Sequence, residues 1–229
     1  MRKLSFAAVA LALTSGAIAA AGDMECPVLE NVRGHENIEW SVAYACGLTD
    51  ATRDLPRVLL VGDSICRGYQ GFVRELLRGK MNVSYWISSY CVTSAAYLPL
   101  LMVYLDEAEY DVIHFNNGLH SLETPTAAYE KGMRRALALI REKQPGAKIV
   151  WCSSTPLTNA VKTAKCRELN MAAAKVVAEF GGIIATDDLF SLLDPLDRAA
   201  NWSDEYHHQE AARKKESEQV VAAVLSAVE

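Results

Sequence analysis

The sequence lacks several features that would assign it to a common class of protein. It has no CxxC pair and no cysteine–histidine spacing typical of zinc ligands, so no metal site is expected. It also lacks GxGxxG and GxxxxGK[ST], so no motif supports a nucleotide cofactor. No basic run occurs and the net charge is −5, which argues against nucleic acid or an anionic membrane as a partner. These absences argue against a zinc protein, a nucleotide-binding protein and a nucleic-acid-binding protein.

Long apolar runs are also missing, apart from a short one at the N-terminus. Arg2 and Lys3 precede an apolar run over residues 4–13, and small residues follow as far as Ala21. This order is typical of a secretory signal peptide, and the run is shorter than the ~18–20 residues that a membrane span needs. We therefore expect residues 1–21 to be a signal peptide. The remainder is expected to be secreted or periplasmic, with no stable membrane association.

The chain has six cysteines, all of which follow the expected signal peptide. An even number in an exported protein favours disulfides, although the spacing does not fix how they pair. For Cys66 and Cys91, two buried free thiols stay open as the alternative. Order along the chain favours three pairs: Cys26–Cys46, Cys66–Cys91 and Cys152–Cys166.

From residue 57 onward, short runs rich in Val and Ile alternate with longer segments of helical periodicity. Five runs read as strands, RVLLV, NVSYWIS, DVIHF, AKIVWCS and GGIIAT, and helical segments lie between and after them. This alternation predicts an α/β fold, with a five-stranded parallel sheet covered by helices on both faces. Residues 22–55 are expected to be an N-terminal extension and residues 56–229 the functional domain.

The first strand runs directly into Gly62, Asp63 and Ser64, in the stretch RVLLVGDSICRGY. Ligands of open parallel sheets bind at the carboxyl ends of the strands, which is where this triplet falls. A serine there becomes a nucleophile only if a base can take its proton and a third group orients that base. Asp204 lies three residues before His207, in a polar stretch ahead of the last helical segment. Together with Ser64 these residues match the logic of an acyl-transfer triad.

Three blocks, VLLVGDS, DVIHFNNGLHSL and SDEYHH, occur in an order that resembles the SGNH hydrolases, also called GDSL-type esterases and lipases. The resemblance implies a flavodoxin-like three-layer sandwich and serine-dependent ester hydrolysis without a metal or an organic cofactor. It implies that Ser64 is the nucleophile and that its backbone N–H is one oxyanion donor. It further implies that His207 is the general base and that Asp204 orients it.

Two blocks depart from the family pattern. The second block, SSYCVTS, has no glycine, so the backbone N–H of Val92 or a neighbour is expected to serve as an oxyanion donor. The third block has His120 where the family has asparagine. Either His120 or Asn116 is expected to complete the oxyanion hole, since both side chains can present an N–H. His114 is expected in the core, and His208 at the surface or the rim of the site.

These observations predict an exported serine esterase that hydrolyses short acyl esters through an acyl-enzyme, with a small-molecule or glycan ester, such as an acetylated carbohydrate, as substrate. Two alternatives stay open. One is a lipase or lysophospholipase, in which the stretch AYLPLLMVYL would line an acyl groove. The other is a non-catalytic glycan-binding protein on an esterase fold, because fold does not guarantee function.

Overall fold

A computed structural model describes residues 39–229 of the chain. The expected signal peptide and Cys26 lie outside the described residues. Five strands belong to one parallel array, and their bounds are β2 Arg57–Gly62, β3 Asn82–Ser88, β4 Val112–Phe115, β5 Lys148–Cys152 and β6 Ile184–Asp187. They match the five runs that the sequence predicts. Strands β2 to β5 are buried along most of their length, as apolar runs predict, whereas the edge strand β6 has Ala185 and Thr186 exposed. The predicted α/β class and parallel sheet are confirmed.

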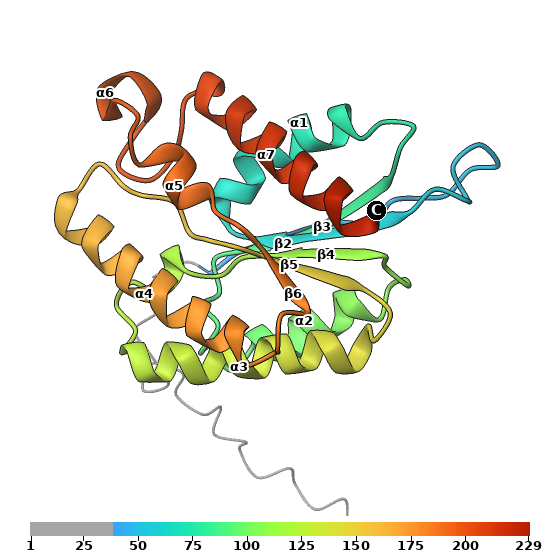
Figure 1. Cartoon of the computed structure of the whole chain (residues 1–229), viewed down its shortest axis with the longest axis horizontal. Coiled ribbons are helices and arrows are strands. Elements are labelled where there is room, and N and C mark those ends of the chain that lie inside the picture. The colour runs from blue at the N-terminus through green and yellow to red at the C-terminus, as the bar shows by residue number, and fades with distance from the viewer. Residues whose placement is uncertain (1–38) are drawn as a thin grey trace, which may run out of the picture.

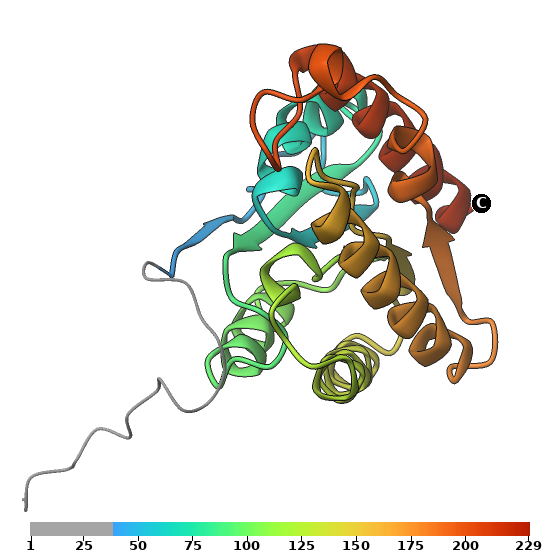
Figure 2. The ribbon, with the colours of Figure 1, turned by 90° about the vertical axis from the view of Figure 1, so that its left-hand side faces the viewer.

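The sheet has a sixth strand that the sequence analysis did not predict. Strand β1, Ser41–Tyr44, pairs antiparallel with β3 and completes the order β1-β3-β2-β4-β5-β6. Figure 2 shows it at the edge of the sheet, coloured blue. All four of its residues are exposed, so it carries no pattern of buried residues that would mark it as a strand. Part of the expected N-terminal extension therefore belongs to the sheet.

Helices cover both faces of the sheet, as expected (Figure 1). On one face α1 packs against α7, with the short helices α5 and α6 beside α7; on the other, α3 packs between α2 and α4. The bounds are α1 Ser64–Leu76, α2 Tyr97–Leu105, α3 Thr126–Lys143, α4 Ala160–Ala178, α5 Leu189–Leu193, α6 Arg198–Asn201 and α7 Glu210–Val228. None of the helices in the described part of the chain is both long and apolar enough to cross a membrane.

The strand order places a topological switch point between β2 and β4. The chain leaves β2 toward β3 on one side, and it returns to β4 on the other side before continuing to β5 and β6. In open α/β sheets the crevice beyond such a point is the usual ligand site. Ser64 lies two residues beyond β2 and Asn116 directly follows β4, so the fold brings the backbones of two predicted site residues to this edge of the sheet.

Candidate active site

Ser64 is the first residue of α1 and is held there by the turn before it. Asp63 caps the helix, because its Oδ1 accepts a hydrogen bond from the Ile65 N–H at 2.9 Å. Gly62 allows the helix to start this close to the strand, since a β-carbon at that position would lie 2.6 Å from the Cβ of Cys66. The Ser64 side chain stays partly exposed at a helix N-terminus, where free N–H groups favour a developing negative charge.

His207 and Asp204 form a hydrogen-bonded pair in the loop between α6 and α7. The Asp204 Oδ2 lies 2.8 Å from the His207 Nδ1, and its Oδ1 accepts the backbone N–H groups of Tyr206 and His207, both at 2.8 Å. Partial desolvation acts to raise the pKa of Asp204, but these hydrogen bonds outweigh it and lower the pKa to about 2. Because a carboxylate only accepts, the pair assigns the proton to Nδ1 and leaves Nε2 with its lone pair.

Ser64 and His207 line one groove of about 370 Å³. It is formed by the first two turns of α1, the loop that carries His207, and the first two turns of α7. The structure therefore brings the predicted nucleophile and the predicted base to the same opening, with Asp204 behind the base. The residues come from opposite ends of the chain and meet because α1 packs against α7.

The loop that holds His207 is braced from both sides. Lys162 of α4 lies 3.0 Å from the Glu205 carboxylate and donates to the Tyr206 hydroxyl at 2.5 Å. On the other side, the His208 Nδ1 lies 2.9 Å from the Glu216 Oε1, with both side chains almost completely buried. The expectation that His208 lies at the surface is therefore wrong, although the residue does line the groove. Its ring packs edge-on against Trp202, and its carboxylate partner comes from α7.

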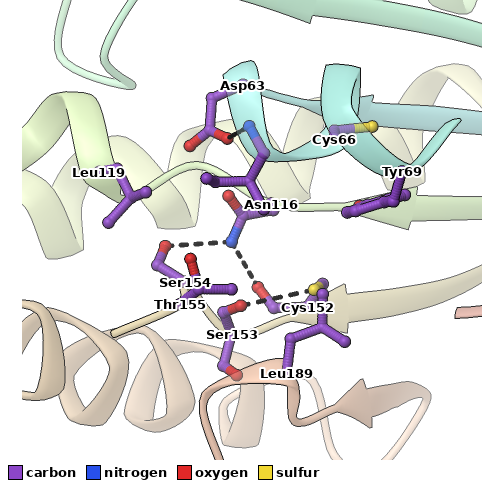
Figure 3. A pocket seen from close by; sticks show the side chains of 11 residues that line it. Asp63, Cys66, Tyr69, Asn116, Leu119, Cys152, Ser153, Ser154, Thr155 and Leu189 are labelled. Carbon is purple, nitrogen blue, oxygen red and sulfur yellow. Dashed lines mark hydrogen bonds between the residues drawn. The ribbon is translucent and has the colours of Figure 1, made fainter. Parts of the chain in front are cut away.

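Two predicted oxyanion donors are already occupied in the structure. The Val92 N–H donates to the Asn117 Oδ1 at 2.9 Å, in a buried position. The Asn116 Nδ2 donates to the Cys152 carbonyl oxygen at 2.7 Å and to the Ser154 Oγ at 3.1 Å. Figure 3 shows the Asn116 amide directed toward these two groups, in a cavity of about 10 Å³ that is too small for a substrate. Both groups hold neighbouring loops together instead of pointing to the groove.

His120 lies half-buried in a short 3-10 helix, η2, Leu119–Ser121. Its ring packs edge-on against Trp40, with ring centroids 6.3 Å apart, and the Arg67 guanidinium lies 5.7 Å from the centre of the same Trp40 ring. Arg67 is one helical turn beyond Ser64, which places its side chain on the same face of α1. His120 is thus linked through Trp40 to the helix that carries the candidate nucleophile.

His114 lies in the core, as predicted. Its side chain is fully buried and its Nε2 lies 2.9 Å from the Asp187 Oδ2, while the Gln219 amide donates to the other oxygen of Asp187 at 2.7 Å. The Cys152 thiol lies within 4.8 Å of these donor atoms. Both oxygens of the Asp187 carboxylate accept or share a hydrogen bond, so we interpret His114, Asp187 and Gln219 as a buried polar network.

The cysteine pairs expected from the sequence are not found among the described residues, where five cysteines are free thiols. The Cys91 Sγ lies 3.0 Å from the Thr93 Oγ1, and the Cys166 Sγ donates to the Thr155 carbonyl oxygen at 3.3 Å. Cys66 points into the sheet, where burial raises the pKa of its thiol. The pairs Cys66–Cys91 and Cys152–Cys166 are therefore not supported. The Cys26–Cys46 pair includes a residue outside the described part.

The comparisons with known proteins agree with this architecture. The chain has the fold of a lipolytic protein of the G-D-S-L family from Veillonella parvula DSM 2008, with a TM-score of 0.63 and 15% identity over 74% of this chain and 98% of that protein. It is similar to a carbohydrate esterase of family 3 from Talaromyces cellulolyticus, with a TM-score of 0.61 and 13% identity over 76% of this chain and 98% of that protein. It is also similar to an acetyl esterase that was solved as its S10A mutant with an acetate ion. The TM-score is 0.61 and the identity is 12%, over 76% of this chain and 98% of that protein.

No family model matches the chain, and no curated protein matches it. At these low identities the likeness establishes the fold. The chain has the flavodoxin-like SGNH-hydrolase fold, as the resemblance of its sequence blocks implied.

Proposed function

We propose that this protein is a serine esterase of the SGNH type that removes short acyl groups from esters. The observation that carries the proposal is the shared groove. Ser64 lines it at a helix N-terminus, and His207 lines it with its Nδ1 held by Asp204. A partly exposed serine, a base in the tautomer that can accept a proton, and a carboxylate that fixes the base are the parts that acyl transfer needs.

In the proposed mechanism, the His207 Nε2 takes the proton of the Ser64 hydroxyl as its Oγ attacks the ester carbonyl carbon. The Ser64 N–H and the His120 side chain stabilise the oxyanion. The intermediate collapses to an acyl-enzyme as His207 protonates the departing alcohol. Water, deprotonated by His207, then attacks the acyl-enzyme and releases the acid and free Ser64. Val92 and Asn116 act by positioning the loops around the oxyanion, through their bonds to Asn117 and to the end of β5.

Two observations support a short acyl group over a long chain. The groove at Ser64 is lined mainly by polar and charged side chains. A more apolar groove, of about 790 Å³, lies between α2 and α3, and neither Ser64 nor His207 lines it. We propose an acetyl group on a carbohydrate as the substrate, in line with the acetyl esterase and the carbohydrate esterase that share the fold. We also propose export through residues 1–21.

The test is hydrolysis of p-nitrophenyl acetate, butyrate and octanoate by the wild-type protein and its Ser64→Ala variant. We expect the acetate to be the best substrate, and the variant to lose activity and labelling by a serine-directed fluorophosphonate. A preference for octanoate would indicate a lipase instead. Equal background rates for both proteins, with no labelling, would indicate a glycan-binding protein, and binding to a glycan array would then follow.

A further inference from the structure

Two arginines line the groove that holds Ser64 and His207. Arg67 projects from α1 one turn beyond the serine, is exposed, and has Trp40 against its guanidinium. Arg213 projects from the first turn of α7 and packs its Cδ against Gly68 of α1, where an added β-carbon would lie 3.1 Å away. The two cations reach the groove from the two helices that form its walls.

Neither arginine has a carboxylate within 4.0 Å among residues 39–229, and the Arg213 Nε is buried there with no hydrogen-bond acceptor. Two acidic side chains lie nearby. Asp204 binds His207 and two backbone N–H groups. The Glu216 Oε1 lies 2.9 Å from the His208 Nδ1, but neither Glu216 oxygen has a hydrogen-bond partner among the described residues. The groove therefore presents two guanidinium groups that form no direct ion pair among residues 39–229, although the buried carboxylate of Glu216 lines the same groove and interacts electrostatically with Arg213. A buried donor without an acceptor is costly, so a ligand that supplies the acceptor gains affinity.

The position of the base tells which part of an ester lies beside these arginines. In the proposed mechanism His207 gives its proton to the oxygen of the departing alcohol, so the alcohol must lie on the His207 side of Ser64. The groove on that side continues past Ser203, Gln209 and Arg213. The acyl group then lies on the side of Ser64 that faces away from His207.

We infer that the substrate is an anionic ester whose alcohol part carries a carboxylate, phosphate or sulfate group, held by Arg67 and Arg213. This inference rests on the proposed function and narrows it from esters in general to acylated acidic alcohols, such as an acidic sugar. Guanidinium groups suit this role because they offer paired N–H donors to planar or tetrahedral anions.

The experiment compares two matched pairs of esters. 4-Acetoxybenzoate and 4-acetoxybenzamide differ in the charge of the alcohol part. Mono-4-nitrophenyl succinate and 4-nitrophenyl butyrate differ in the charge of the acyl part. For each pair, the anionic-to-neutral ratio of kcat/KM is measured in wild type and in the Arg67→Gln, Arg213→Gln and Arg213→Lys variants, so the intrinsic reactivities of the esters cancel. Arg135→Gln, an arginine of α3 on the other face of the sheet, is the control.

We expect each glutamine substitution to lower the benzoate-to-benzamide ratio about threefold to tenfold, mainly through KM. Arg213→Lys should restore part of the loss, added salt should lower the wild-type ratio, and Arg135→Gln should leave it unchanged. Phosphate and sulfate analogues of the benzoate then identify the preferred anion.

If kcat/KM falls by the same factor for the neutral and the anionic esters in the variants, the inference is overturned, while the proposed esterase activity still stands. A loss confined to the succinate ester would place the anion on the acyl side and overturn the assignment to the alcohol. If the wild-type protein hydrolyses none of the four esters and resists the fluorophosphonate, the proposed function fails, and this inference fails with it.

Discussion

Replacing Asp204 by asparagine tests the arrangement of the proposed base. The asparagine oxygen can still accept the backbone N–H groups of Tyr206 and His207, which now bind the Asp204 Oδ1 at 2.8 Å. Its Nδ2 then replaces the oxygen that faces the His207 Nδ1. Because an amide nitrogen only donates, His207 must move its proton to Nε2, and it can no longer take the proton of Ser64.

The size of the effect follows from what is lost. General-base catalysis contributes about 10²–10⁴-fold, so we expect kcat to fall by that factor, which corresponds to about 3–5 kcal/mol. The Asp204 side chain is 54% exposed, so the fold should lose less than about 1 kcal/mol. Asp197, which caps α6 nearby through the Ala200 N–H, provides the control variant Asp197→Asn, because asparagine caps a helix about as well as aspartate.

The assay is steady-state hydrolysis of p-nitrophenyl acetate, with thermal unfolding of each variant measured in parallel. Asp197→Asn should retain wild-type kcat. If Asp204→Asn keeps more than a tenth of the wild-type kcat, the tautomer of His207 does not depend on Asp204 and the triad assignment is wrong. A large drop in melting temperature would show instead that the loop needs the carboxylate for folding.

Three further predictions concern stability. Glu216→Ala should lower the free energy of unfolding by about 3–5 kcal/mol in urea titrations, because it leaves His208 buried without its partner, whereas Glu216→Gln should cost clearly less. Gly118→Ala should cost about 1–3 kcal/mol in the same titrations, since the new Cβ would lie 1.9 Å from the Ser154 Oγ. The pKa of Asp204 is lowered in the folded state, so its contribution to stability is present above about pH 4 and is lost as the pH falls toward 2. The difference in urea midpoint between wild type and Asp204→Asn should therefore shrink below pH 4.

The parallel core of the fold could be predicted because strands that are buried on both faces have continuous apolar runs in their sequence, such as Val58–Val61 of β2. Strand β1 could not be predicted in this way. It is an edge strand whose four residues are exposed, and it is held by its pairing with β3 and by contacts such as the hydrogen bond from the Trp86 ring to the Ser41 hydroxyl. Such contacts depend on the fold and leave no periodic signal in the segment itself.

Some residues of the candidate site could likewise be predicted from the sequence, and others could not. The order of the three blocks pointed to Ser64, Asp204 and His207. The orientation of side chains at strand ends is not encoded in such blocks, so the hydrogen bonds that occupy Val92 and Asn116 were missed. The groove arginines were missed because they meet only through the packing of α1 on α7. Only Arg67 carried a signal, its spacing of three residues from Ser64 on one helix.

The contrast between the exposed base and its buried neighbour explains how a loop can hold a catalytic geometry. His207 must stay accessible to substrate, and 45% of its side chain is exposed. An exposed loop residue is poorly positioned by itself, and small displacements of a base are costly to the rate. His208, the next residue, is anchored by a fully buried carboxylate on α7, which fixes the backbone of the base without covering its ring. The same helix supplies Arg213, so a single element would set both the position of the base and the charge that an incoming substrate meets.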